Sequence, residues 1–408
     1  MDSAFKQYLV VTGNYWAFTI TDGALRMLVV LYFYGLGYSA LEIATLFLLY
    51  EFFGVVTNLV GGWLGAHLGL NNTMQIGLLL QIIALGMLTV DDSLLSVAYV
   101  MVAQALSGIA KDLNKMSAKS SVKLLMPGQD QQGSLYKWVA ILTGSKNSLK
   151  GAGFFVGAAL LTILGFQNSM LAMASALVAI LFASFFLLKT DLGKAKSKPK
   201  FTHLFSKSRS INILSAARLF LFGARDVWFV VALPVFFQAS LNWSHTQVGT
   251  FMALWIIGYG IIQGFAPVIT GLKKGKIPDG KTAMLWVFPL MLIPVLITGA
   301  FFFNAEMGTI EIILVGGLLI FGGLFAVNSS VHSFLILTYA REDGVSLDVG
   351  FYYMANAMGR LIGTILSGAM YQWYGLEACL ITSSLFLFLA FIISAGLERV
   401  GAKQKEAA

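Results

Sequence analysis

Long apolar stretches, separated by short polar segments, follow one another along the whole chain. A helix needs about 20 predominantly apolar residues to cross the hydrocarbon core of a bilayer, and twelve stretches meet that requirement. The pattern therefore predicts an all-α polytopic membrane protein with twelve transmembrane helices. The helices are expected near residues 13–35, 41–65, 73–90, 94–115, 134–164, 168–188, 211–238, 245–270, 282–303, 309–337, 347–372 and 376–397.

The Lys and Arg residues between these spans fall into one alternate set of loops, whereas the other set carries acids such as Asp91, Glu306 and Glu311. Basic loops are retained on the cytoplasmic side of a membrane. Both termini and the long basic segment 189–210 are therefore expected in the cytoplasm, with the acidic loops on the opposite side. The membrane is predicted to be the inner (plasma) membrane.

The segment 189–210 also divides the chain into two halves of six spans, and residues 36–45 resemble residues 241–250 at the corresponding turn of the other half. Six plus six spans with such a repeat are typical of major facilitator transporters, which bind substrate near the membrane midplane between the halves. The predicted organisation is an N-terminal six-helix bundle (1–188), a basic cytoplasmic linker (189–210), a C-terminal six-helix bundle (211–397) and a cytoplasmic tail (398–408).

Composition narrows the function further. The chain is 58% hydrophobic and 11% charged, whereas soluble domains average about 45–50% and about 25%, so a soluble enzyme and a disordered chain are excluded. The single cysteine, Cys379, and four scattered histidines predict no disulfide framework, no metal site and no cofactor. The net charge of +8 has no folded basic domain to carry it, which argues against nucleic acid as a partner. No catalytic constellation is present, so no enzyme is predicted.

Nine basic residues fall inside the predicted spans, where a central Arg or Lys costs about 2.5–3.5 kcal/mol on insertion scales. Each is therefore expected to face a partner or a water-filled cavity. They are Arg26, Lys111, Lys115, Lys137, Lys146, Lys150, Arg218, Arg225 and Arg360.

Four of these cations lie at a similar depth on four different helices. Arg26, Lys146, Arg225 and Arg360 each fall about 20 Å from the cytoplasmic start of a span at the rise of an α-helix. In the major facilitator arrangement these helices line the central cavity, so an anionic small-molecule substrate is expected there. The guanidinium fork suits phosphate-like oxyanions, and the number of cations favours two such groups. Further candidate substrate-binding residues are Lys150, Arg218, Lys111, Lys115, Asn147 and Trp228.

Acids inside the spans offer a structural alternative to substrate binding, because they can neutralise the cations. They are fewer than the cations, so the substrate is expected to supply the missing counter-charge. The expected pairs are Asp22 with Arg26, Asp112 with Lys111 or Lys115, Asp226 with Arg218 or Arg225, and Glu51 with any midplane cation.

Proton coupling adds a second possible role for some of these groups. Asp22 and Glu51 are the candidate coupling acids, with Asp22 expected to act mainly by neutralising a cation. His332 is either a titrating group or a member of an interhelical hydrogen bond, and the hydrogen bond is the favoured interpretation.

Lys111, Lys115, Lys119 and Lys123 are spaced four residues apart and form one stripe along a helix. Two interpretations stay open. The stripe is either a path that attracts anions toward the cavity or a solvated face that contacts anionic lipid headgroups of the membrane.

Several long blocks, most of which carry charges inside spans, resemble one branch of the major facilitator superfamily. The chain is similar in these blocks to the ArsJ-type organoarsenical efflux permeases, and the likeness extends over nearly its whole length. The blocks lie at residues 13–30, 50–63, 106–119, 142–151 and 222–229.

The resemblance implies export of 1-arseno-3-phosphoglycerate, which forms when glyceraldehyde-3-phosphate dehydrogenase accepts arsenate in place of phosphate. It also implies arsenate resistance and a functional link to that dehydrogenase. The substrate carries a phosphate at one end and an arsenate at the other, in agreement with the number of cations. A sugar-phosphate or other organic-anion carrier, a drug:proton antiporter and an anion sensor that does not transport stay open as alternatives.

Overall fold

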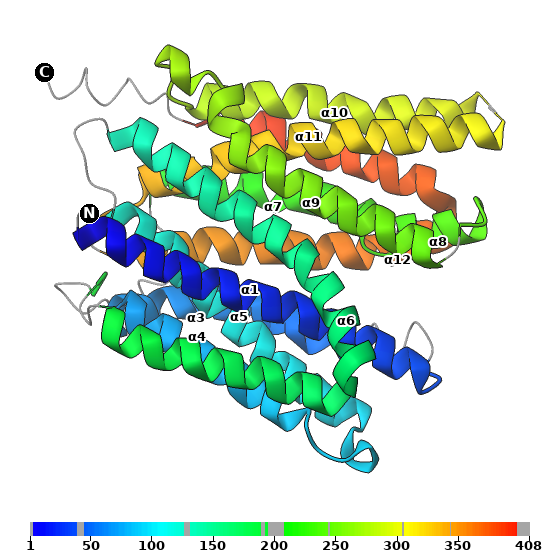
Figure 1. Ribbon diagram of the computed structural model, residues 1–408. Coiled ribbons are helices and arrows are strands. Elements are labelled where there is room, and N and C mark those ends of the chain that lie inside the picture. Colours follow the sequence, from blue (N-terminus) through cyan, green and yellow to red (C-terminus); the bar gives the residue numbers. More distant parts are fainter. Residues whose placement is uncertain are drawn as a thin grey trace, which may run out of the picture. The chain divides into compact units, whose positions relative to one another are not determined.

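The computed structural model consists of helices joined by turns and short irregular segments, and no strand occurs in the part of the chain that it describes (Figure 1). It describes residues 3–38, 45–125, 131–188, 192–194, 208–243, 245–303, 306–342 and 344–397. The helices are α1 (Ser3–Gly35), α3 (Leu48–Leu68), α4 (Leu70–Met87), α5 (Val97–Leu125), α6 (Gln131–Leu187), α7 (Arg209–Phe229), α8 (Ala232–Ala239), α9 (His245–Ile269), α10 (Gly280–Phe302), α11 (Met307–Tyr339) and α12 (Val345–Ser394).

Two of the longest helices contain a non-helical glycine. Gly165 in α6 has φ 75° and ψ 179°, and Gly375 in α12 has φ 79° and ψ −174°. Glycine adopts positive φ at little cost because it has no Cβ. Both positions fall between neighbouring predicted spans, so each glycine ends one span and begins the next.

Nine helical stretches in the described part of the chain are long and apolar enough to cross a membrane. Dividing α6 and α12 at their glycines adds two spans, and the lysine-bearing α5, with 29 residues, adds another. The all-α architecture with twelve spans that the sequence predicts is confirmed.

The chain forms two compact units. Unit 1 comprises residues 1–135, 145–206 and 340–354, and unit 2 comprises the remainder. Unit 1 thus contains α1, α3, α4, α5, most of α6 and the first turns of α12. Unit 2 contains α7 to α11, the rest of α12 and a short stretch of α6.

In unit 1, the backbones of α1 and α6 touch where the two helices cross. A Cβ added to Gly23 would lie 2.6 Å from the Lys150 carbonyl oxygen, and a Cβ added to Gly153 would lie 2.6 Å from that of Ile20. Small residues allow such close approach between membrane helices. The crossing therefore holds α1 against α6 beside Asp22.

A second close crossing in unit 1 joins α3 to the first turns of α12. Gly62 lies against the backbone of Ser346, and a Cβ added to Gly350 would lie 2.6 Å from the Asn58 carbonyl oxygen. The Ser346 hydroxyl donates a hydrogen bond of 2.8 Å to the Gly62 carbonyl oxygen. This contact explains why residues 340–354 belong to the compact unit of the N-terminal helices.

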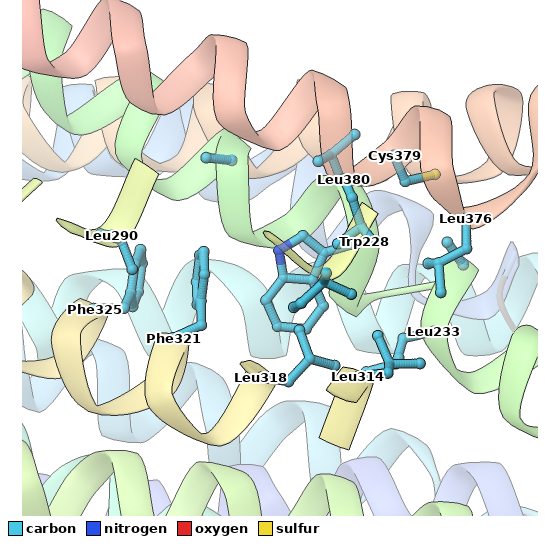
Figure 2. Packing of buried hydrophobic residues seen from close by; sticks show 14 of the residues in the cluster. Trp228, Leu233, Leu290, Leu314, Leu318, Phe321, Phe325, Leu376, Cys379 and Leu380 are labelled. Carbon is cyan, nitrogen blue, oxygen red and sulfur yellow. The ribbon is translucent and has the colours of Figure 1, made fainter. Parts of the chain in front are cut away.

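The core of unit 2 is an aromatic and aliphatic cluster, part of which Figure 2 shows. Trp228 of α7 is fully buried at its centre, with ring-centre distances of 5.1 Å to Phe321 and 6.1 Å to Trp255. Burial of such large rings stabilises helix packing through dispersion contacts. The cluster fixes α7 against α9 and α11, and thereby positions the charged face of α7.

Candidate functional site

The charged residues inside the spans gather in one cluster in each unit. Each cluster is built by side chains from helices that are distant in the sequence. The unit 1 cluster consists of Asp22, Arg26, Tyr50, Glu51, Lys111, Asp112, Lys115 and Lys150. The unit 2 cluster consists of Arg218, Arg225, Asp226, Asn356 and Arg360.

Asp22 lies at the crossing of α1 with α6. One of its carboxylate oxygens is 3.3 Å from Lys150 Nζ, and the other accepts a hydrogen bond of 2.6 Å from the Tyr50 hydroxyl. Neutralisation of Arg26 by Asp22 stays a prediction, and Lys150 is an ion-pair partner of Asp22 that the sequence did not indicate. The glycine contacts bring α6 so close to α1 that an ammonium group from α6 reaches this carboxylate.

Arg26 and Glu51 form an ion pair between α1 and α3. The distance from Arg26 Nη2 to Glu51 Oε1 is 3.2 Å, and the two side chains are 29% and 27% exposed. The guanidinium also lies 5.0 Å from the centre of the Phe47 ring. The predicted pairing of Glu51 with one of the cations is confirmed, and that cation is Arg26.

Asp112 is contacted by two lysines of its own helix, α5. Lys115 Nζ donates a hydrogen bond to Oδ1, and Lys111 Nζ lies 3.5 Å from Oδ2. The sequence offered Lys111 and Lys115 as alternative partners, and the structure shows both at once. One carboxylate therefore neutralises only half of the charge beside it.

Tyr50 is the residue of this cluster that the sequence did not single out. Its ring centre lies 3.9 Å from Lys111 Nζ and 4.8 Å from the Arg26 guanidinium carbon, while its hydroxyl binds Asp22. A cation over an aromatic face is attracted by about 0.5–2 kcal/mol. The one available signal was its position next to Glu51, because aromatic residues are ordinary packing residues in membrane helices.

The lysine stripe of α5 continues from this cluster toward residues 340–353. Lys119 is 5% exposed and its Nζ donates a hydrogen bond of 2.5 Å to the Tyr353 hydroxyl. Lys123 Nζ donates to the Ala340 carbonyl oxygen. The interpretation of a stripe solvated beside lipid headgroups is wrong for Lys119, because its ammonium group is buried within unit 1.

Two candidates on α6 contact each other. Lys146 Nζ donates a hydrogen bond of 3.1 Å to Asn147 Oδ1. Both side chains are partly exposed. Their role in binding substrate stays a prediction.

In unit 2, a single carboxylate is shared by two guanidinium groups. Arg225 Nε donates a hydrogen bond of 2.6 Å to Asp226 Oδ1, and Arg360 Nε donates one of 3.1 Å to Oδ2. Asp226 is fully buried, whereas the side chains of Arg225 and Arg360 are 15% and 32% exposed. The structure thus joins two of the four predicted midplane cations through one acid.

Arg218 has neutral partners. Its Nε donates a hydrogen bond of 2.8 Å to Asn356 Oδ1, and its Nη1 donates one of 3.0 Å to the Ser329 hydroxyl. Its guanidinium carbon lies 3.9 Å from the centre of the Phe222 ring. The sequence offered Arg218 or Arg225 as the partner of Asp226, and the ion pair found is with Arg225, joined by Arg360.

Two further candidates lie in the packed interior of unit 2. Trp228 is surrounded by apolar side chains (Figure 2), and its Nε1 has no hydrogen-bond partner among the described residues. Both ring nitrogens of the fully buried His332 also lack a partner in that part of the chain. The interhelical hydrogen bond favoured for His332 is therefore not found there, while a titrating role stays a prediction.

Positive charge exceeds negative charge in both clusters. The unit 1 cluster holds four cations and three carboxylates. The unit 2 cluster holds three guanidinium groups and one carboxylate. Unneutralised charge is costly away from bulk water, and the binding of an anion by these clusters stays a prediction.

Comparison with protein families gives an independent result for the chain as a whole. The family model described as Major Facilitator Superfamily matches residues 9–277. No curated protein matches the chain.

Three solved structures show the same fold. The human organic anion transporter MFSD10 (TETRAN) has a TM-score of 0.75 and 16% identity, over 97% of this chain and 100% of that one. A bacterial homologue of the iron transporter ferroportin, in the outward-facing state, has a TM-score of 0.72 and 15% identity, over 97% and 99%. The E. coli fucose:proton symporter FucP has a TM-score of 0.72 and 10% identity, over 97% and 99%.

The family match covers well over half of the 408 residues, and these three structures share the helical fold over nearly the whole chain. The chain belongs to the major facilitator superfamily of membrane transporters.

Proposed function

We propose that this transporter exports a doubly anionic organoarsenical, 1-arseno-3-phosphoglycerate, by alternating access and thereby confers arsenate resistance. A glyceraldehyde-3-phosphate dehydrogenase that accepts arsenate supplies the substrate. In this proposal the protein resides in the inner membrane with both termini in the cytoplasm, and the cationic cluster of each unit binds anionic oxygen atoms of the substrate.

The observation that carries the proposal is the sharing of Asp226 by Arg225 and Arg360. Two guanidinium groups beside one carboxylate leave a net positive charge, and each guanidinium carries N–H donors in a planar fork. A tetrahedral oxyanion with two or more oxygens matches this donor set. A neutral sugar or an amine would leave the extra charge without compensation.

Two further observations support an organic anion as the substrate. The charged blocks of the sequence resemble those of the ArsJ-type permeases, and these blocks contain the unit 1 cluster together with Arg225 and Asp226 of the unit 2 cluster. The fold is also that of a human protein described as an organic anion transporter. A likeness at 16% identity shows the fold alone, so the assignment of the arsenical as substrate rests on the sequence resemblance.

The proposal is tested in everted membrane vesicles supplied with the dehydrogenase, glyceraldehyde-3-phosphate, NAD⁺ and arsenate. Arsenic should accumulate inside vesicles that contain the protein, and omission of the dehydrogenase should abolish accumulation. Vesicles with Arg360→Gln should accumulate little. Accumulation that is independent of the dehydrogenase would show that free arsenate is the substrate and would overturn the proposal.

Inhibition of uptake by competing anions tests whether the substrate must carry one anionic group or two. Stable three-carbon acids with two phosphate groups should inhibit uptake strongly, whereas free phosphate should inhibit weakly, because a single oxyanion leaves cations uncompensated. Cells should gain no resistance to arsenite, which is neutral at pH 7. Equal inhibition by phosphate and by the bisphosphate would assign the clusters to a single oxyanion.

A further inference from the structure

Unit 2 contains an open cavity of about 400 Å³ where the connection from α8 to α9 meets the start of α11. It is separate from the unit 2 cluster, with which it shares no residue. Its lining consists of Trp243, Gln247, Thr250, Phe251, Leu254 and Glu311.

An aromatic wall gives this cavity a fixed shape. The Trp243 ring stacks on Phe237 with 4.3 Å between ring centres, and it meets Phe251 edge-on at 5.9 Å. The Trp243 indole N–H donates a hydrogen bond of 2.9 Å to Glu311 Oε1. The indole face and the carboxylate are therefore held side by side.

Glu311 gives the cavity the opposite charge to that of the two cationic clusters. It is the one charged residue of the lining, and no described Lys or Arg pairs with it. A carboxylate beside aromatic faces binds organic ammonium groups, because the carboxylate accepts N–H hydrogen bonds and the rings attract the cation. The site therefore selects a cationic group rather than an anionic substrate.

The surroundings of the cavity indicate which ammonium compound fits. Leu254 lines the cavity, and Leu254, Ile261 and Phe265 are 57%, 51% and 61% exposed. Their spacing of seven and four residues places them on one face of α9. This apolar face leads away from the cavity and suits a hydrocarbon chain.

We propose that this cavity binds the primary ammonium headgroup of phosphatidylethanolamine, with an acyl chain along the exposed face of α9. The hydroxyl of Thr250, which lines the cavity, is a neutral donor for the phosphodiester. A zwitterionic headgroup matches one carboxylate and a neutral donor, whereas an anionic headgroup would meet Glu311 with like charge.

The test measures lipid bound to the purified, full-length transporter by native mass spectrometry after exchange into defined lipids. Glu311→Gln should weaken retention of phosphatidylethanolamine at least about tenfold, because a hydrogen bond to a charged acceptor is lost. The matched control is Glu306→Gln, which makes the same charge change at an exposed residue outside the cavity lining. The control should retain the lipid as the unaltered protein does.

The second part of the test compares how strongly the protein retains lipids with different headgroups. Phosphatidylcholine, which has no ammonium N–H, should be retained more weakly than phosphatidylethanolamine, and phosphatidylglycerol should be retained more weakly still. Equal retention by Glu311→Gln and the unaltered protein, or a preference for phosphatidylglycerol, would overturn the proposal. Soluble phosphoethanolamine that displaces the lipid at comparable concentration would identify a free amine as the ligand and overturn the lipid assignment. None of these outcomes alters the test of organoarsenical export.

Discussion

The Tyr50 hydroxyl donates a hydrogen bond of 2.6 Å to Asp22, although the two residues lie on different helices and only one of them is charged. The same phenol ring faces two cations, Lys111 at 3.9 Å and Arg26 at 4.8 Å. One neutral side chain thus holds an acid and separates two positive charges. The unit 1 cluster depends on this aromatic residue as much as on its ion pairs.

Replacement of Tyr50 separates these two contributions. Tyr50→Phe removes one hydrogen bond to a carboxylate, with a net effect of about 1.5–3 kcal/mol, and should raise the KM of uptake roughly tenfold or more. Tyr50→Leu also removes the aromatic ring that contacts both cations, and it should raise the KM of uptake further than Tyr50→Phe does. Tyr99→Phe is the control, because it removes a hydrogen bond of 2.9 Å to the Met87 carbonyl oxygen, outside both clusters. An equal KM for Tyr50→Phe and Tyr50→Leu would contradict a role of the ring.

Asp226 should matter for stability and Arg360 for transport. Asp226→Asn leaves two guanidinium groups around a neutral amide, and breaking such a buried pair costs about 3–5 kcal/mol. Arg360→Gln leaves Asp226 paired with Arg225, so the protein should unfold near its usual temperature but transport poorly. Thermal unfolding in detergent, read beside vesicle uptake, checks both expectations. A larger loss of Tm in Arg360→Gln than in Asp226→Asn would contradict them.

The shape of the guanidinium group, and not its charge alone, should be required at Arg225. Arg225→Lys keeps the charge but loses the planar fork that binds two oxygens. We expect uptake to fall about tenfold or more, the scale of one charge-assisted hydrogen bond, with normal membrane insertion. Arg341→Lys is the matched control, since Arg341 is 64% exposed and its ion pair with Asp348 lies outside both clusters. Unchanged uptake by Arg225→Lys would refute the requirement.

The two acids of the first helices should differ in their effect on pH dependence. The Glu51 side chain is 27% exposed, whereas that of Asp22 is 5% exposed, so Glu51 exchanges protons with water more readily. Glu51→Gln should flatten the dependence of uptake on pH while substrate still binds. Asp22→Asn should lower stability and binding together and keep the pH profile. The opposite pattern would assign the coupled proton to Asp22.

The crossing of α1 and α6 should tolerate no added methyl group. In Gly153→Ala the new Cβ would lie 2.6 Å from the Ile20 carbonyl oxygen, so the helices must separate and Tm should fall. Gly13→Ala is the control on α1, where nothing lies within 4 Å of the Cβ position. It should be neutral or stabilising, because Ala favours a helix interior over Gly by about 1 kcal/mol. Equal Tm values for the two variants would contradict the packing argument.

The number and order of the spans were predictable because hydropathy is a local property of the sequence and a helix of fixed length is needed to cross the bilayer. Their boundaries were less so: α1 begins at Ser3 where the expected span begins at 13, and α5 ends at Leu125 where the expected span ends at 115. The breaks at Gly165 and Gly375 do fall where the apolar runs change. Which residues carry charge inside the spans was equally visible in the sequence. The family itself followed from the arrangement of six plus six spans.

Ion-pair partners were less predictable, because they depend on how each helix is rotated and where it crosses its neighbours. Asp22 and Arg26 are one turn apart, yet they pair with α6 and α3. Trp228 was a reasonable candidate beside Arg225, but successive residues of a helix point in different directions, and its ring faces the core. Tyr50 carries no charge, so only the tertiary contacts reveal it.

The reversals at Gly165 and Gly375 affect how the orientation of this protein in a membrane can be mapped. Helices joined through a single non-helical residue leave no flexible segment for a protease or for an inserted epitope. Neither junction should be cleaved in intact cells, whichever side of the membrane it faces. Cysteine labelling at the longer acidic turn around Asp91 and Asp92 is therefore the better means of assigning sidedness.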